Sequence, residues 1–252
     1  MNFGEDALSR DAFLDGRLRI RQPLKGYRAA TDPVLLAASV PAQSAQSVLD
    51  LGCGAGVAAL CLAARVPGLR LTGIEVQPDY AALARRNAVE NRLDLEVIEG
   101  DLAALPRSLR NRSFDHVIAN PPYHAKDKGS PATDAGRERA LREETPLAVW
   151  IATAARRLSP KGYLSMIQTV ERLPEMLVAL SGCMSSLEIK PIAPRTGRAA
   201  NRVLVRARKT GRAGFRLHAP LILHEGLVHD GDGENFTPVV RRILRDAVAL
   251  TF

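Results

Sequence analysis

The sequence predicts an α/β protein built on one doubly wound, mostly parallel sheet with an antiparallel late strand. From residue 47 onward, short apolar segments alternate with amphipathic or alanine-rich ones, the order of strands and helices in such a sheet. Residues 114–119 are almost wholly apolar, as expected of a strand covered on both faces. Residues 187–192 and 203–208 are joined too briefly for a parallel crossover, so we expect the second to be antiparallel.

Residues 1–46 are expected to precede the main domain, which is expected to span residues 47–252 and to end in a basic C-terminal extension. Residues 1–17 carry early acids and no sustained apolar pattern, which predicts a loosely ordered arm. Residues 18–28 alternate apolar and basic side chains and predict a small hairpin. An Asp-Pro pair then opens a short helix over residues 32–40.

The main domain is predicted to be seven-stranded. The strands are expected at 47–51, 69–76, 95–98, 114–119, 162–169, 187–192 and 203–208. Helices are expected at 55–65, 79–91, 146–158 and 171–180, and from residue 237 onward. Between them lies a long polar loop over 121–145, and loops of that length in compact domains usually carry function.

Composition indicates a globular protein with an affinity for polyanions. Apolar residues make up 46% and charged residues 25%, which is ordinary for a chain with a core. No apolar run is long enough to span a bilayer, and the N-terminus lacks a secretory pattern, so we expect a cytoplasmic protein away from membranes. Three cysteines without paired spacing argue against disulfides and structural zinc. The net charge of +8 favours nucleic acid as partner.

A glycine-rich turn follows the first strand of the main domain. Asp50 precedes a G-x-G-x-G pattern, whereas a dinucleotide fingerprint needs glycine where Val57 stands, so nicotinamide-dependent reduction is disfavoured. A carboxylate here would repel phosphate but attract a cationic sulfonium ligand with an ammonium group; the alternative is a plain strand-to-helix turn. The pattern resembles motif I of the S-adenosylmethionine methyltransferases. That resemblance implies S-adenosylmethionine as cofactor, held by Asp50, Gly52, Cys53, Gly54 and Gly56.

Acidic residues follow the next two strands. Glu75, with Val76 beside it, can accept hydrogen bonds from both hydroxyls of a ribose, as acids at this position do in NAD enzymes too. Resemblance to the same family implies that Asp101 accepts from the adenine amino group of the cofactor, near the backbone of Leu102. The alternative is that Asp101 only caps the helix that follows.

The fourth strand is followed by Asn120-Pro121-Pro122-Tyr123, a pattern suited to methylating a conjugated amine. The lone pair of such an amine is delocalised, so the nitrogen is a poor nucleophile. The side-chain oxygen of Asn120 and the carbonyl of Pro121 can accept its two hydrogens and draw the nitrogen toward sp³ geometry. Tandem prolines hold that carbonyl rigidly, and Tyr123 offers a face on which a flipped base can stack. Catalysis is then alignment and electrostatic stabilisation, without a general base.

This pattern resembles motif IV of the methyltransferases that act on adenine N6, cytosine N4 or protein glutamine. Thr31-Asp32, followed by Leu35-Leu36, resembles a further element of the bacterial tRNA adenine-N6 methyltransferases that modify valine tRNA beside the anticodon. That family lies within the "methyltransferase small" group, and the resemblance covers roughly residues 18–250. It implies a Rossmann-like methyltransferase sheet, an adenine in tRNA as target, and closure of the cofactor pocket by Thr31 and Asp32.

Clustered basic residues support RNA as the partner, since a base pocket needs phosphate contacts around it. They lie before Thr31, in the loop after Tyr123 and late in the chain: Lys25, Arg28, Arg137, Arg139, Arg142, Arg195, Arg198, Arg202, Arg206, Arg208, Lys209, Arg212 and Arg216. Each could equally be a solvated surface residue.

Three alternatives stay open: a protein glutamine N5-methyltransferase, another small-group enzyme acting on ribosomal RNA, and a non-catalytic RNA-binding module. Glutamine methyltransferases usually carry a helical domain that the first 46 residues cannot supply. No metal site is expected, because His224 and His229 are five residues apart, where a helical zinc motif needs four. The oligomeric state is left open.

Overall fold

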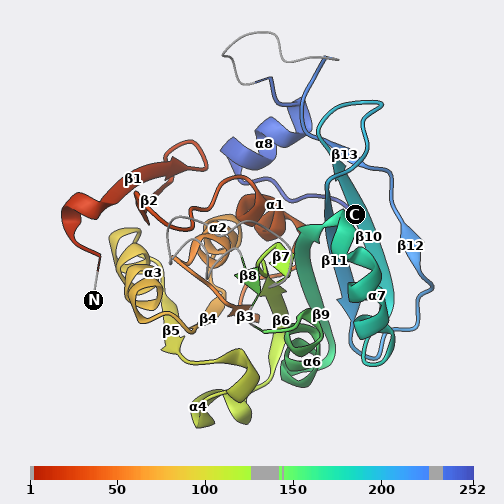
Figure 1. Ribbon diagram of the computed structural model, residues 1–252, viewed down its shortest axis with the longest axis horizontal. Coiled ribbons are helices and arrows are strands. Elements are labelled where there is room, and N and C mark those ends of the chain that lie inside the picture. Colours follow the sequence, from red (N-terminus) through yellow and green to blue (C-terminus); the bar gives the residue numbers. More distant parts are fainter. Residues whose placement is uncertain (1–2, 126–141, 144, 227–234) are drawn as a thin grey trace.

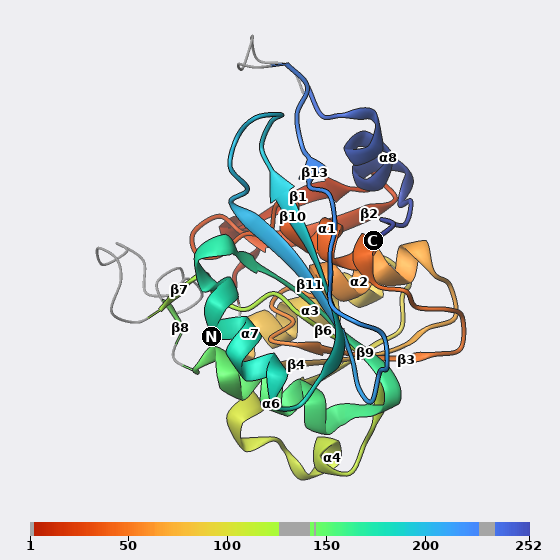
Figure 2. The same ribbon diagram turned by 90° about the vertical axis from the view of Figure 1, so that its right-hand side faces the viewer.

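The computed structural model describes residues 3–125, 142–143, 145–226 and 235–252 (Figure 1). A twisted central sheet lies between two layers of helices (Figures 1 and 2). No helix in these residues is long and apolar enough to cross a membrane.

The sheet has nine strands among the described residues, hydrogen-bonded in the order β12-β10-β11-β9-β6-β3-β4-β5, with β13 beside β10. They are β3 (Ser47–Leu51), β4 (Arg70–Glu75), β5 (Leu95–Glu99), β6 (Phe114–Ala119), β9 (Leu158–Thr169), β10 (Ser185–Ala193), β11 (Arg202–Arg208), β12 (Arg216–Leu217) and β13 (Leu221–Ile222). Only β11 in this sheet runs antiparallel to its neighbours. The doubly wound, mostly parallel sheet is confirmed, and two short strands extend it beyond the seven predicted.

Helices cover both faces of the sheet and enclose one apolar core on each. They are α1 (Asp32–Ser39), α2 (Val57–Arg65), α3 (Pro78–Glu90), α4 (Arg107–Arg110), α6 (Leu147–Arg157), α7 (Leu173–Ser181) and α8 (Pro238–Asp246), with 3-10 turns η1 (Glu5–Ala7), η2 (Leu102–Ala104) and η3 (Val170–Arg172). Side chains of α1, α2, α3 and α8 share one core, and those of α4, α6 and α7 share the other. The short α4 was not predicted.

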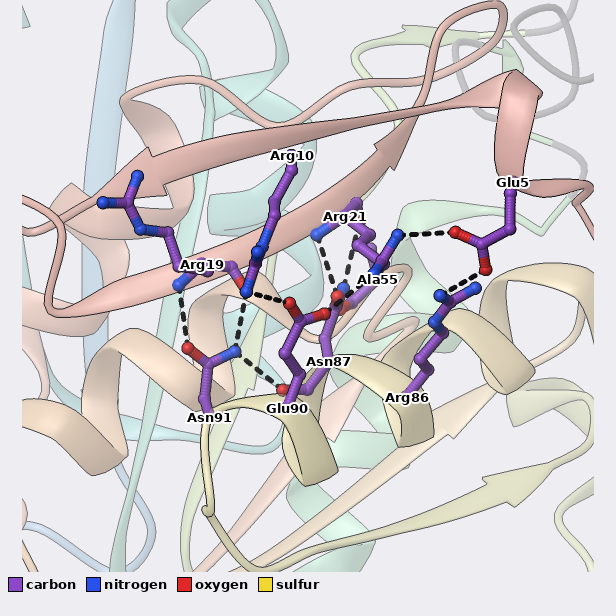
Figure 3. Close-up of polar contacts among 9 residues, drawn as sticks. All are labelled: Glu5, Arg10, Arg19, Arg21, Ala55, Arg86, Asn87, Glu90 and Asn91. Carbon is purple, nitrogen blue, oxygen red and sulfur yellow. Dashed lines mark hydrogen bonds and ion pairs between the residues drawn. The ribbon is translucent and has the colours of Figure 1, made fainter.

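The N-terminal segment differs from its prediction. Residues 8–13 (β1, Leu8–Phe13) and 18–23 (β2, Leu18–Pro23) form an antiparallel hairpin, so the predicted loose arm over 1–17 and hairpin over 18–28 are both wrong. The early acid Glu5 pairs with Arg21 and Arg86 and thereby fastens this segment to β2 and α3 (Figure 3). The division of the chain into domains at residue 46 stays a prediction.

The predicted long loop after β6 is only partly described. His124–Ala125 (β7) pairs in parallel with Arg142–Glu143 (β8), and residues 126–141 and 144 lie outside the described part.

Asn87 joins the hairpin to the body of the protein. It is fully buried on α3, and its amide oxygen accepts from the backbone N–H of Arg21 at 2.9 Å. Its amide nitrogen donates to the carbonyls of Arg21 at 3.1 Å and of Ala55 at 2.9 Å (Figure 3). One side chain therefore satisfies backbone groups of β2 and of the turn before α2.

Asn87→Ala is expected to lower the free energy of unfolding by ~2–4 kcal/mol, because it leaves buried backbone groups without partners. Urea denaturation with a constant m-value would measure the loss. Asn91→Ala is the matched control: Asn91 makes the same pair of bonds to Arg19 one turn later, at 2.8 Å each, but at a more exposed position. Its loss should be about 1 kcal/mol or less, because water replaces the lost bonds. Equal losses for the two variants would contradict this account.

Candidate active site

The candidate site lies where the carboxyl ends of β4, β3 and β6 meet. In the register of the sheet, Leu51 lies beside Ile74 on one side and Ala119 on the other. The chain therefore brings Glu75, Gly52 and Asn120 to one level of the sheet. β3 is also the strand from which the order reverses, and ligands of doubly wound sheets bind at that point.

The glycine turn after β3 uses its three glycines for different reasons. All three have positive φ, at +62° for Gly52, +55° for Gly54 and +84° for Gly56. A Cβ on Gly52 would lie 2.5 Å from the Trp150 ring, whereas one on Gly54 would meet open space. Gly56 caps the start of α2. The turn thus packs tightly against the protein at Gly52 and is open to a ligand at Gly54.

Glu75 holds this turn against β4. One carboxylate oxygen accepts from the backbone N–H of Gly54 and the other from that of Gln77, both at 2.9 Å. Burial raises the pKa of Glu75, and hydrogen bonds from these backbone groups oppose the rise. The neighbouring Val76 is 57% exposed. An apolar side chain so placed beside Glu75 could cover a flat ligand group.

A cleft opens above these strand ends. The residues that line it come from β2, the segment between β2 and α1, the helices α1, α2 and α3, and the strand ends: Gln22, Tyr27, Ala29, Pro33, Asp50, Gly52, Cys53, Gly54, Ala55, Val57, Ala58, Tyr80 and Asn120. Two buried oxygens in it, Oδ2 of Asp50 and Oδ1 of Asn120, have no hydrogen-bond partner among the described residues. Buried polar atoms are almost always paired, so these two mark where a ligand supplies the missing donors.

Asp50 suits a cationic ligand. It is 3% exposed, and burial raises the pKa of its carboxyl to about 8; the charge of Glu75 adds to the rise and a backbone hydrogen bond at Ala59 opposes it. A bound ammonium group would restore the charged form by Coulomb attraction. Unpaired acceptors, an open glycine and a buried acid together fit S-adenosylmethionine, which carries an ammonium group, a ribose and an adenine.

Asn120 is oriented by a tyrosine that the sequence analysis missed. Its amide nitrogen donates to the hydroxyl of Tyr27 at 3.2 Å, which leaves its oxygen toward the cleft. Tyr27 is fixed in turn by Tyr80, whose hydroxyl donates to the Tyr27 carbonyl at 3.1 Å and accepts from its N–H at 3.0 Å. The signal in the sequence was an aromatic residue just before the Thr31-Asp32 element.

The two prolines of the motif present their carbonyls to a buried glutamine. Gln168, fully buried at the end of β9, donates its amide to the carbonyls of Pro121 at 3.3 Å and Pro122 at 3.1 Å. Its own oxygen accepts from the N–H of Thr169 at 2.8 Å. A carbonyl has two lone pairs, so Pro121 can still accept from a substrate. Gln168 was also missed, because nothing in its strand pattern distinguishes it from other core positions.

Tyr123 is linked to α1 and β11. Its hydroxyl donates to the carboxylate of Asp32, which also accepts from Nε of Arg202 at 3.2 Å. Thr31 caps the N-terminus of α1, and its carbonyl accepts from the N–H groups of Val34 and Leu35. Thr31 and Asp32 are not among the residues that line the cleft. Their predicted role in closing the cofactor pocket stays a prediction.

Asp101 does cap the following turn. Its carboxylate accepts from the N–H of Ala103 at 2.8 Å at the start of η2, and Leu102 is buried beneath it. The acid is exposed at the carboxyl end of β5, next to β4. Its predicted contact with the cofactor adenine stays a prediction, and capping does not prevent it, since the second oxygen remains.

The basic residues predicted to surround the site divide between the two edges of the sheet. Arg202 pairs in register with Thr169 at the carboxyl edge, and Arg195 and Arg198 lie in the loop before it. Arg208 pairs with Tyr163, six residues along β9 and so roughly 20 Å away. Lys209, Arg212 and Arg216 follow Arg208 at that far edge. Those four residues cannot surround a target bound at Asn120.

Several of the others are engaged within the protein. Arg28 pairs with Asp11 at 2.7 Å, Arg206 pairs with Glu188 at 2.9 Å, and the guanidinium of Arg195 donates to backbone carbonyls near residue 225. Arg137 and Arg139 lie outside the described residues, as does His229. The structure describes Arg142 only through its backbone in β8.

This arrangement defines a class. A doubly wound sheet, a glycine turn preceded by a buried acid, an acid at the end of the next strand and Asn-Pro-Pro-Tyr after β6 make the chain an S-adenosylmethionine-dependent methyltransferase. The family model of the methyltransferase small domain matches residues 30–188, and the chain belongs to that family.

Relatives and solved structures agree with this class. The tRNA1(Val) (adenine(37)-N6)-methyltransferase of Porphyromonas gingivalis is 36% identical over 175 residues, in a match that covers 66% of this chain and 68% of the relative. The crystal structure of a predicted O-methyltransferase from Agrobacterium tumefaciens is 32% identical, with a TM-score of 0.70 over 87% of this chain and 98% of that one. The 16S rRNA N2 G1207 methyltransferase of T. thermophilus, solved with AdoMet and guanosine, shares the fold: 18% identity, a TM-score of 0.55, and coverage of 80% of this chain and 50% of that one.

The protonation of Asp50 generates a prediction. In the free protein its pKa of about 8 keeps the carboxyl mostly protonated at pH 7, and a bound ammonium group should lower that pKa. We therefore expect S-adenosylhomocysteine, which carries the same ammonium group, to release close to one proton on binding at pH 7. Titration calorimetry in buffers of different ionisation enthalpy measures it.

Asp50→Asn should abolish that proton release and weaken binding by about tenfold or more, the scale of a lost charge-assisted hydrogen bond. A wild-type protein that releases no proton, or a variant that still does, would place the ammonium group elsewhere.

Proposed function

We propose that this protein methylates the exocyclic N6 amino group of an adenine in tRNA. One observation carries the proposal: the buried oxygen of Asn120 lies at the cleft without a partner, directly before the rigid carbonyl of Pro121. The side-chain oxygen of Asn120 and the carbonyl of Pro121 are two adjacent acceptors, which suits an amino group that donates two hydrogens. A hydroxyl has only one, so the oxygen target named for the Agrobacterium neighbour fits this pair less well.

The residues proposed to hold the cofactor are those at the strand ends. Asp50 and Glu75 would accept from its ammonium and ribose groups, and Asp101 from its adenine. The others proposed are Thr31, Gly52, Cys53, Gly54, Gly56, Val76 and Leu102, with Asn120 at the border between cofactor and target. Asp32, predicted to close the same pocket, contacts Tyr123 and is not among the residues that line the cleft, so we place it on the target side. When bound, S-adenosylmethionine supplies an electrophilic methyl group.

The protein's own residues would prepare the target nitrogen. Asn120 and Pro121 accept its two hydrogens, which shifts the nitrogen toward sp³ geometry and directs its lone pair. Tyr27 holds the Asn120 amide in the orientation that this requires, and Gln168 steadies the two proline carbonyls. Because acceptors and ring are positioned before the reaction, little reorganisation is needed in the transition state. Tyr123 would stack on the base and complete the catalytic group of Asn120, Pro121, Pro122 and Tyr123.

tRNA is supported by the chain's net charge of +8 and by its similarity to the Porphyromonas enzyme, which is named for valine tRNA. A tRNA substrate and unpaired cysteines would place the protein in the cytoplasm. Of the other targets, a protein glutamine also offers an amide nitrogen with two hydrogens, so the test must separate it from RNA.

The test is transfer of labelled methyl from S-adenosylmethionine to bulk tRNA from a strain lacking this protein, followed by nucleoside analysis. We expect the label in N6-methyladenosine. Label in no tRNA nucleoside, with cofactor binding intact, would overturn tRNA as substrate, and parallel reactions with ribosomal RNA and with release-factor protein would then identify the target.

Asn120→Ala should lower kcat by about 100-fold or more, the usual cost of a lost transition-state acceptor or donor, while changing the Kd of S-adenosylhomocysteine by less than about threefold. Single-turnover rates and calorimetry measure the two quantities. Asp50→Asn is the matched comparison, since its main effect should be on the Kd. If Asn120→Ala retained wild-type turnover, the proposed role of this amide would be wrong.

A further inference from the structure

We propose that Asp32 and Arg202 form a positioning pair for Tyr123 that sets which face of its ring receives the target base. This inference rests on the proposed function, since it concerns how the same site holds its substrate. It assigns Asp32 to the target side of the site, and it assigns Arg202 a role within the protein rather than at RNA phosphate.

Three contacts define the pair. The Tyr123 hydroxyl donates to Oδ2 of Asp32, and Nε of Arg202 donates to the same oxygen at 3.2 Å. The guanidinium carbon of Arg202 also lies over the Tyr123 ring, 4.4 Å from its centre. Tyr123 is therefore held at its hydroxyl end by one residue and covered on one face by the other.

The position of each residue follows from the fold. Asp32 is the first residue of α1, and Arg202 is the first residue of β11, paired in register with Thr169 at the carboxyl edge. The residues lie 170 positions apart in the chain. Asp32 and Arg202 both contact Tyr123 just after β6 ends. These two contacts restrict rotation of the Tyr123 ring.

The arrangement has a geometric consequence beyond any stabilisation of the fold. The ion pair of Arg202 and Asp32 is partly buried, with side chains 29% and 21% exposed. A guanidinium stacked on one face excludes a base from that face, so an incoming base can stack only on the opposite one. The side of the ring on which the target lies is thereby fixed.

The chain offers a matched control on the same strand. Arg208 lies over the Tyr163 ring with its guanidinium carbon 5.0 Å from the ring centre, at the far edge of the sheet. Arg202→Lys and Arg208→Lys both keep the positive charge and both remove a planar group from a tyrosine face. Only Arg202 adjoins the candidate site, so a general effect of charge or folding should appear in both variants.

We would measure steady-state methyl transfer to unmodified tRNA and the Kd of S-adenosylhomocysteine for wild type, Asp32→Asn, Arg202→Lys and Arg208→Lys. For Asp32→Asn and Arg202→Lys we expect kcat/KM for tRNA to fall by about tenfold or more, with the cofactor Kd within about twofold of wild type. For Arg208→Lys we expect both to stay within about twofold of wild type. Thermal midpoints close to wild type would show that each variant is folded.

A second readout does not depend on turnover. Tetranitromethane modifies tyrosine as phenolate, and burial beside the Asp32 carboxylate raises the pKa of Tyr123. Removing that carboxylate or uncovering the ring should increase nitration of Tyr123 several-fold, measured by peptide mass spectrometry. In Arg208→Lys, Tyr123 nitration should stay at the wild-type level.

The outcomes separate the two proposals. If Asp32→Asn weakened cofactor binding, Asp32 would belong to the cofactor pocket and the proposed pair would be wrong. Equal effects of Arg202→Lys and Arg208→Lys on tRNA kinetics would also contradict the pair. If the wild type methylated no tRNA at all, the proposed function would fail. Nitration would then decide whether the pair holds Tyr123: unchanged nitration in both Asp32→Asn and Arg202→Lys would overturn it.

Discussion

The reversal of strand order at β3 is the constraint on which the candidate site depends. Because β4 lies on one side of β3 and β6 on the other, the chain leaves three adjacent strands at one level of the sheet. The turn after β3 can then donate a hydrogen bond from the N–H of Gly54 to Glu75 on one neighbouring strand, while Asn120 follows the other neighbouring strand. The cofactor and target halves of the site are therefore neighbours by topology.

Because these strand ends converge, buried polar groups of the cleft are left without hydrogen-bond partners within the described part of the chain. Asp50 is buried where water does not compensate its charge, and its raised pKa reflects the cost. The oxygen of Asn120 is unpaired in the same cleft. Such groups weaken a ligand-free fold, and they are most simply retained because ligands complete them. The same buried, unpaired acceptors therefore destabilise this edge of the ligand-free sheet and favour binding of ligands that can donate to them.

On the target side, rigidity comes from remote parts of the chain. Tyr27 precedes the sheet, whereas Gln168 and Arg202 lie on β9 and β11, and all three contact the Asn-Pro-Pro-Tyr segment. The antiparallel β11 matters here, because its direction brings its first residue to the carboxyl edge. Much of the arginine content is likewise used internally, so net charge alone overstates the surface offered to RNA.

The local patterns of this sequence were sufficient for the sheet, its late antiparallel strand and the glycine turn, because strand and helix periods and turn glycines are short-range properties. They failed at the N-terminus, where the hairpin segment is held by contacts with α3 far along the chain, between Glu5 and Arg86 and between Arg21 and Asn87. They also could not find Tyr27, Gln168 or the pairing of Asp32 with Arg202. The sequence by itself determined which chemical groups stand at the strand ends. Only the tertiary structure decided which groups hold them, because those contacts join residues tens to hundreds of positions apart.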